Sequence, residues 1–132
     1  MKLIVCLDDN NAMAFHNRRL SSDFVVTERI FEMVSNHRLW LDSYSGYLFA
    51  DFNGNIQIDN DFLSKAEEND FCFVETADVS PFISKVTEIY VFRWNRVYPG
   101  DLFFPEIPAK KQVLSEFAGN SHERITLEAY RL

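Results

Sequence analysis

The 132 residues include 20 acidic and 13 basic side chains, a formal net charge of −7 that repels nucleic acid and favours basic partners. With 47% hydrophobic residues, the chain is long and apolar enough to fold as one domain, residues 1–132, and is not a disordered tail. No run of 18 apolar residues could cross a membrane, and the first apolar stretch reaches Asp8 too early for a signal peptide, so we expect a cytoplasmic protein.

The apolar pattern predicts strands that alternate with short helices. Residues 2–7 are continuously apolar, which is typical of a strand covered on both faces, and residues 8–14 form a turn-rich loop. Asp23 and the two serines before it can cap a helix that we expect over 23–35. Further strands are expected at 38–41, 56–58, 71–74, 87–92, 112–117 and 125–130, and short helices at 44–49, 59–66 and 80–84.

This order of elements predicts an α/β fold. Helices between the early strands require parallel pairing, whereas the last two strands follow each other with no helix between them. We therefore expect a single-domain, mainly parallel twisted sheet flanked by helices, with an antiparallel C-terminal strand. Cys6 and Cys72 fall within apolar strands and are expected to be reduced core residues.

The segment 89–105, with the sequence IYVFRWNRVYPGDLFFP, resembles the late strand and the following loop of dihydrofolate reductases. In that family a strand leads to Gly-Asp and then to Phe-Pro. The matching positions are Tyr90, Val97, Gly100, Asp101, Phe104 and Pro105. Weaker similarity at 14–17 and at 120–122 extends the resemblance to most of the chain and implies a dihydrofolate reductase-like fold. The chain also resembles small uncharacterised proteins of Gram-positive mobile elements.

The resemblance implies a catalytic acid that opens the first helix and pairs with a threonine at the end of the late strand. Asp23 is the candidate for this acid. The threonine position holds Phe92, which cannot form a hydrogen bond. A buried Asp23 without that partner would be costly, so we expect it either to be exposed or to have lost its role.

The resemblance also implies a Gly-Gly pair after a buried strand, where the backbone approaches the phosphates of a dinucleotide. Here the equivalent strand, 71–74, runs into Glu75, Thr76, Ala77 and Asp78. Each carboxylate close to a pyrophosphate would cost about a few kcal/mol. We therefore predict that no cofactor binds, with NADPH as the cofactor only if the chain is a reductase.

The net charge comes from one middle segment. Residues 51–80 have eight carboxylates and one basic residue, Lys65, whereas the rest of the chain has equal numbers of acidic and basic groups. Such a segment is either a solvated face or a surface that binds a basic partner. Its carboxylates are those of Asp51, Asp59, Asp61, Glu67, Glu68, Asp70, Glu75 and Asp78.

A second candidate surface combines aromatic and basic side chains at Arg93, Trp94, Arg96 and Tyr98. Tryptophan, tyrosine and arginine are frequent at interface hot spots, so this stretch could contact a partner or a second copy of the chain. Alternatively, it is an edge strand whose tryptophan packs on the core.

No metal site is predicted. The acidic turn at Asp8 lacks the alternate-residue spacing of a calcium loop, and the histidines lack the spacing of zinc ligands. His122 follows Asn-Ser in a turn, where we expect a hydrogen-bonded structural role.

Three functions remain open. The first is a non-enzymatic acidic binding protein that docks on the basic surface of a nucleic-acid-binding host protein, as an anti-CRISPR or anti-restriction inhibitor of a mobile element would. The second is a divergent NADPH-dependent reductase with Asp23 as its acid. The third is a structural module that dimerises through Trp94 and Tyr98.

Overall fold

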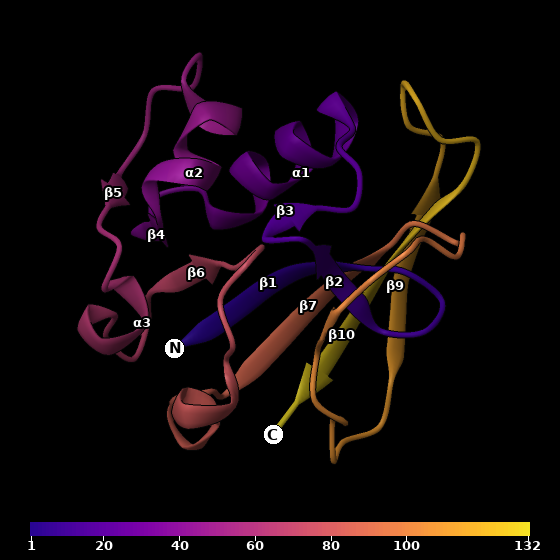
Figure 1. Ribbon diagram of the computed structural model, residues 1–132. Helices are drawn as coiled ribbons and strands as arrows, with labels where there is room; N and C mark the ends of the chain where they lie inside the picture. Colours follow the sequence, from indigo (N-terminus) through magenta and orange to yellow (C-terminus); the bar gives the residue numbers. More distant parts are fainter.

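A seven-stranded sheet, with strand order β5-β4-β6-β1-β7-β10-β9, runs through the computed structural model, which describes residues 1–132 (Figure 1). Strands β1, β4, β5, β6 and β7 are parallel, β10 is antiparallel to β7, and β9 is antiparallel to β10. The predicted fold class is confirmed. The strands are β1 (Lys2–Leu7), β4 (Leu39–Leu41), β5 (Ile56–Ile58), β6 (Phe71–Phe73), β7 (Glu88–Arg93), β9 (Gln112–Phe117) and β10 (Ile125–Arg131).

Helix α1 (Phe24–Val34) begins where the sequence predicts. Asp23 has extended backbone, and its carboxylate accepts a hydrogen bond from the backbone N of Val25 at 3.0 Å, which satisfies one free donor of the first turn. Val26, Ile30 and Val34 recur every four residues and are buried, so one face of the helix packs on the sheet.

Both faces of the sheet are covered by apolar side chains. On one face, α1 and the 3-10 helix η1 (Tyr47–Phe49), which continues from α2 (Ser43–Gly46), pack against Phe73 and Phe92. The other face packs against α3 (Phe62–Lys65) and the 3-10 helix η2 (Ser80–Lys85). None of these helices is long and apolar enough to cross a membrane.

A second, three-stranded sheet overturns the prediction of a loop over 8–14. Residues Ala12–Phe15 form β2, which lies between β3 (Arg18–Arg19) and β8 (Leu102–Phe103). His16 and Asn17 join β2 to β3 with φ values of 50° and 61°, the positive values that a two-residue hairpin turn requires. The strand was missed because its Ala-Met-Ala run contains no β-branched residue and has weak strand propensity.

The Gly-Asp pair of segment 89–105 secures this second sheet. A Cβ at Gly100 would lie 2.6 Å from the Cβ of Ala12, so only glycine permits this approach. The carboxylate of Asp101 accepts hydrogen bonds from the backbone N of His16 at 3.1 and 3.3 Å. The pair therefore holds the β2–β3 hairpin against the loop that precedes β8.

The predicted short helices exist but differ in extent. The helix over 59–66 is reduced to α3, because the carboxylate of Asp59 accepts a hydrogen bond from the backbone N of Asp61 at 2.8 Å and forms a turn there. The helix over 44–49 divides into α2 and η1, and the one over 80–84 is a 3-10 helix. Cys6 and Cys72 are free, and burial raises the pKa of both thiols, that of Cys72 to about 12.

Candidate functional site

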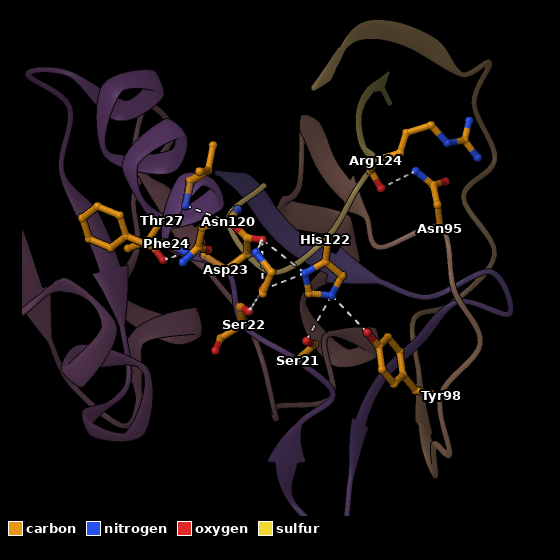
Figure 2. Close-up of polar contacts among 12 residues, drawn as sticks. Ser21, Ser22, Asp23, Phe24, Thr27, Asn95, Tyr98, Asn120, His122 and Arg124 are labelled. Atoms are coloured by element: carbon orange, nitrogen blue, oxygen red, sulfur yellow. Dashed lines mark hydrogen bonds and ion pairs between the residues drawn. The ribbon is translucent and has the colours of Figure 1, made fainter. Parts of the chain in front are cut away.

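Asp23 is the centre of a buried polar network at the start of α1 (Figure 2). Its Oδ1 accepts hydrogen bonds from the backbone N atoms of Val25 and Asn120, both at 3.0 Å. Its Oδ2 accepts hydrogen bonds from the backbone N of Ser121 at 2.9 Å and from the Ser121 hydroxyl at 3.0 Å. Gly119 lies so close to this carboxylate that there is no space for a Cβ. The loop before β10 is therefore fitted around Asp23.

His122 connects this network to the opposite loops. Its Nδ1 lies 3.2 Å from Asp23 Oδ2, and its Nε2 lies 3.0 Å from the Tyr98 hydroxyl and 3.2 Å from the Ser21 hydroxyl (Figure 2). Because an ionised carboxylate only accepts, we assign the ring hydrogen to Nδ1, and Nε2 then accepts from the two hydroxyls. The Trp94 ring stacks on the imidazole at a centroid distance of 4.5 Å. The expected hydrogen bonding of His122 is confirmed, and the ring is buried.

The protonation state of Asp23 follows from these contacts. Burial raises the pKa of the carboxyl group, but the hydrogen bonds from Ser121, Asn120, His122 and Val25 outweigh burial and lower the pKa to about 2. The group is therefore ionised at neutral pH, and its oxygens already accept five hydrogen bonds. A carboxylate in this state is poorly suited to donate a proton to a substrate.

Asp23 obtains its hydrogen-bond partners from outside the late strand, where Phe92 stands at the position of the threonine that the resemblance implies. Phe92 is fully buried in the apolar core, as its side chain requires. The partners of Asp23 instead come from Asn120, Ser121 and His122, nearly one hundred residues away along the chain. Sequence reasoning noticed this polar triplet as a turn but had no signal that it would cap the helix at Asp23.

The contacts resemble those of a hydrolase triad, because His122 lies between the Ser21 hydroxyl and the Asp23 carboxylate. A serine nucleophile needs an open space in which a substrate carbonyl can approach. The cavity beside Ser21, enclosed by Cys6, Phe73 and Trp94 among others, has a volume of about 10 Å³, room for about one water molecule. The arrangement therefore joins three loops and does not present a nucleophile.

Glu75, in the turn after β6, forms a second buried polar cluster. Its carboxylate accepts hydrogen bonds from Arg19 Nε at 2.7 Å and Arg19 Nη2 at 2.9 Å, and from the Ser45 hydroxyl at 2.8 Å. Burial works to lower the pKa of Arg19, but the bonds to Glu75 raise it above its ordinary value. The Arg19 guanidinium also lies over the Tyr44 ring at 4.3 Å. Glu75 is therefore an internal ion-pair partner.

Comparison with known proteins gives one kind of match. No protein-family model and no curated protein matches the chain. A solved structure that resembles it is a dihydrofolate reductase from Enterococcus faecalis complexed with NADP(H) and RAB-propyl, with 12% sequence identity and a TM-score of 0.62. The match covers 98% of this chain and 95% of that one. The chain has the dihydrofolate reductase fold. This likeness describes the scaffold and leaves function to the site itself.

The resemblance seen in the sequence implies that a dinucleotide would bind at the turn after β6, so the residues of this turn can be tested for fit. None of the four glycines lies between Val74 and Val79. The Glu75 side chain is directed inward to Arg19, which is then not free to bind a phosphate, and Asp78 is exposed. The prediction that two negative charges would meet a pyrophosphate here is therefore wrong for Glu75, which is buried and paired, and holds only for the exposed Asp78. Without a glycine and with Asp78 exposed, this turn does not fit a pyrophosphate.

The acidic segment is divided by burial. Asp70 and Glu75 are buried; Asp70 accepts hydrogen bonds from the Trp40 indole at 2.9 Å and from the backbone N of Glu67 at 2.9 Å. Asp59 is half-buried and paired with Lys65. The remaining carboxylates are exposed: those of Asp51, Asp61, Glu67, Glu68 and Asp78. Of the predicted acidic face, the two buried residues therefore cannot contact a partner.

The aromatic-basic stretch is mostly internal. Trp94 is only 2% exposed, and Arg93 pairs with Glu128 at 2.9 Å, while Tyr98 is half-buried beside His122. Of the four residues, Arg96 alone is fully exposed. Trp94 thus packs on the core, as the alternative expected, but the expected edge strand is wrong, because β7 lies between β1 and β10. No group of three His, Cys, Asp or Glu side chains is placed to hold a metal ion.

Proposed function

We propose that this chain is a non-enzymatic acidic binding protein built on a dihydrofolate reductase scaffold. Its partner is the basic surface of a host protein that handles nucleic acid, and an inhibitor of the anti-CRISPR or anti-restriction type would have this chemistry. The protein would act in the cytoplasm, where its two free thiols stay reduced. The observation that carries the proposal is that Glu75, in the turn where the resemblance places the phosphates of a dinucleotide, is paired internally with Arg19.

The filled site argues against turnover. The cavity between α1 and the sheet, on the Ser21 side of Asp23, has a volume of only about 10 Å³, far less than the several hundred Å³ of an ordinary ligand pocket. A larger cleft of about 450 Å³, which Asp23 also lines, opens outward between α1 and η1. The turn after β6 is closed by the ion pair of Arg19 with Glu75. The small cavity beside Asp23 and the Arg19–Glu75 pair both leave little space for a ligand on this scaffold.

The exposed carboxylates support binding to a basic partner. Asp51, Asp61, Glu68 and Asp78 have no cation within 4.0 Å, so their charge faces solvent. The loops around α3 and the end of η1, which include most of them, lie on the β4–β5 side of the sheet (Figure 1). A protein groove that binds phosphates would release its own anions when it accepts such carboxylates, which makes the affinity sensitive to salt.

The test is capture from host lysate with the tagged full chain, followed by elution with increasing salt and, separately, with duplex DNA. We expect a nucleic-acid-binding protein that elutes at moderate salt and is displaced by DNA. The triple variant Asp61→Asn/Glu67→Gln/Glu68→Gln should weaken its binding at least tenfold at low salt.

A matched control removes three exposed carboxylates outside the segment, in the variant Asp9→Asn/Glu106→Gln/Glu123→Gln, which has the same net charge. This variant should retain most of the affinity. Capture of no protein, an affinity that ignores salt, or equal losses in the two variants would contradict the proposal.

The reductase alternative has one supporting observation, the scaffold itself, whose solved neighbour is complexed with NADP(H). It is tested by mixing the purified chain with NADPH and dihydrofolate and following absorbance at the nicotinamide band. We expect no loss of absorbance beyond the rate without protein. Turnover that disappears in Asp23→Asn would establish the alternative instead.

A further inference from the structure

An open cleft separates the start of α1 from η1 and the loop before β10. Its volume is about 450 Å³, and it adjoins the small cavity beside Ser21, with which it shares Asp23, Thr27 and Leu48 among its lining residues. Phe24, Tyr47, Leu48 and Phe52 provide its apolar surface, and Asp51 lies among them. Figure 2 shows the Phe24 ring directed away from His122, and the cleft adjoins the polar network through Asp23, Asn120 and Ser121, which belong to both.

The aromatic surface of this cleft is unusually accessible. The Phe24 side chain is 55% exposed and Tyr47 is 82% exposed. Beneath them, the Phe52 ring is held by Phe31 at a centroid distance of 4.8 Å and by Phe49 at 6.1 Å, and Phe24 stacks over Phe52 at 6.2 Å. A rigid aromatic base with free ring faces can bind a planar or cationic group at low entropic cost.

The polar groups of the cleft select the charge of its occupant. Two carboxylates and no basic side chain line it. Asp23 is saturated by its five donors, but Asp51 is exposed and has neither a hydrogen-bond nor an ion-pair partner. An anionic group, such as a phosphate, would meet an uncompensated negative charge, whereas a cation would gain both the carboxylate and the ring faces.

We propose that this cleft receives an arginine side chain from the basic partner, a site that deepens the proposed function and rests on it. The guanidinium is planar, stacks on aromatic rings and can donate two hydrogen bonds to one carboxylate. Phe24 and Tyr47 provide the stacking surface, and Asp51 accepts the hydrogen bonds. The apolar stem of the arginine packs against Leu48 and Phe52.

The probe is N-acetyl-arginine amide, titrated into the full chain and followed by the NMR shifts of individual amides, with N-acetyl-citrulline amide as the neutral isostere. We expect saturable shifts at Phe24, Tyr47, Asp51 and Phe52, with citrulline at least fivefold weaker. Asp51→Asn and Tyr47→Ala, both at exposed positions, should each weaken arginine binding at least threefold.

The control is Glu68→Gln, which removes one exposed carboxylate of the same acidic segment outside the cleft and should leave the affinity unchanged. Equal binding of citrulline, equal losses in Glu68→Gln and Asp51→Asn, or no saturable shift at the cleft would overturn the site. A duplex DNA titration that shifts the same amides would overturn it as well, because the occupant would then be a nucleic acid.

The experiments distinguish a failure of the arginine site from a failure of the proposed function. If lysate capture yields a salt-sensitive partner whose affinity is unaffected by Asp51→Asn and Tyr47→Ala, the proposed function stands and the arginine site is wrong. If the arginine probe binds as described but no protein is captured, the cleft is a cation site and the inhibitor role is wrong. If the chain itself is found as a dimer by light scattering, and Asp51→Asn dissociates it, the arginine belongs to a second copy and the host partner is excluded.

Discussion

Arg19 and Glu75 form a two-point ion pair between strand β3 and the turn after β6, with Nε–Oε2 and Nη2–Oε1 distances of 2.7 and 2.9 Å. The Glu75 side chain is 6% exposed and that of Arg19 is 24% exposed, so water screens the pair weakly. The pair connects β3 of the small sheet to the turn after β6 of the large sheet. The contact therefore stabilises the fold, and under our proposal it also leaves the turn after β6 unfit for a dinucleotide.

Arg19→Ala should lower the free energy of unfolding by about 3 kcal/mol, because it leaves the Glu75 carboxylate buried without its cation. Arg18→Ala is the control, since Arg18 is exposed and unpaired, and it should change stability by less than about 0.5 kcal/mol. Urea unfolding measures both. Adding Glu75→Gln to Arg19→Ala should restore part of the loss; equal stabilities of the two arginine variants would contradict the account.

Asp23 should make stability depend on pH in the acidic range. Its folded pKa, about 2, lies below the ordinary value of 3.8, so its contribution is present above pH 4 and is lost as the pH falls towards 2. The difference in unfolding free energy between the wild type and Asp23→Asn should therefore shrink by about 2 kcal/mol across this window. Asp9→Asn, at an exposed position, should show no such change. A difference that stays constant from pH 6 to pH 2 would be inconsistent with an ionised, hydrogen-bonded Asp23.

Gly119→Ala should be destabilising, because the added methyl group would collide with the Asp23 carboxylate. Overpacking of this kind costs about 1–3 kcal/mol, and here it would also disturb the hydrogen bonds from Ser121. Ala118→Ser, at the exposed neighbouring position, is the matched control. Thermal unfolding distinguishes them; wild-type stability in Gly119→Ala would mean that the loop before β10 is not fitted tightly to Asp23.

Trp94→Ala should destabilise the fold by about 3–5 kcal/mol, since a large buried side chain that stacks on His122 is lost. Trp94→Phe retains a ring and should cost less. Light scattering should give the same mass for both variants as for the wild type. A mass of Trp94→Ala below that of the wild type, with unchanged stability, would instead indicate that Trp94 forms a dimer contact.

The main sheet could be predicted from sequence because each of its strands is a local run of apolar or branched residues. The small sheet could not, because β2 pairs with β8 across nearly ninety residues and its Ala12 and Ala14 resemble loop residues. The network of Asp23 and His122 was missed for the same reason. Each residue was noticed separately, but the contact spans 99 residues and involves no motif.

The sequence gives the net charge of the segment 51–80 correctly, but it does not show which of its carboxylates are exposed. Nothing in the sequence distinguishes the eight carboxylates of 51–80 from one another. Glu75 is nevertheless buried and paired with Arg19, and Asp70 is buried and paired with Arg38, because these arginines come from distant segments. For Trp94 the sequence left a contact residue and a core residue as alternatives, because alternation along β7 does not say which face is covered. In both cases tertiary partners decided the exposure.

The central claim is our proposal that this chain does not bind a dinucleotide, because the turn after β6 has no glycine and its Glu75 is paired with Arg19. Isothermal titration of the purified chain with NADPH tests this most directly, with a functional dihydrofolate reductase titrated in parallel as the positive control. We predict no saturable heat at NADPH concentrations that saturate the control. Saturable binding of NADPH that is abolished by an added bulky side chain in the turn after β6, such as Thr76→Trp, would contradict the account.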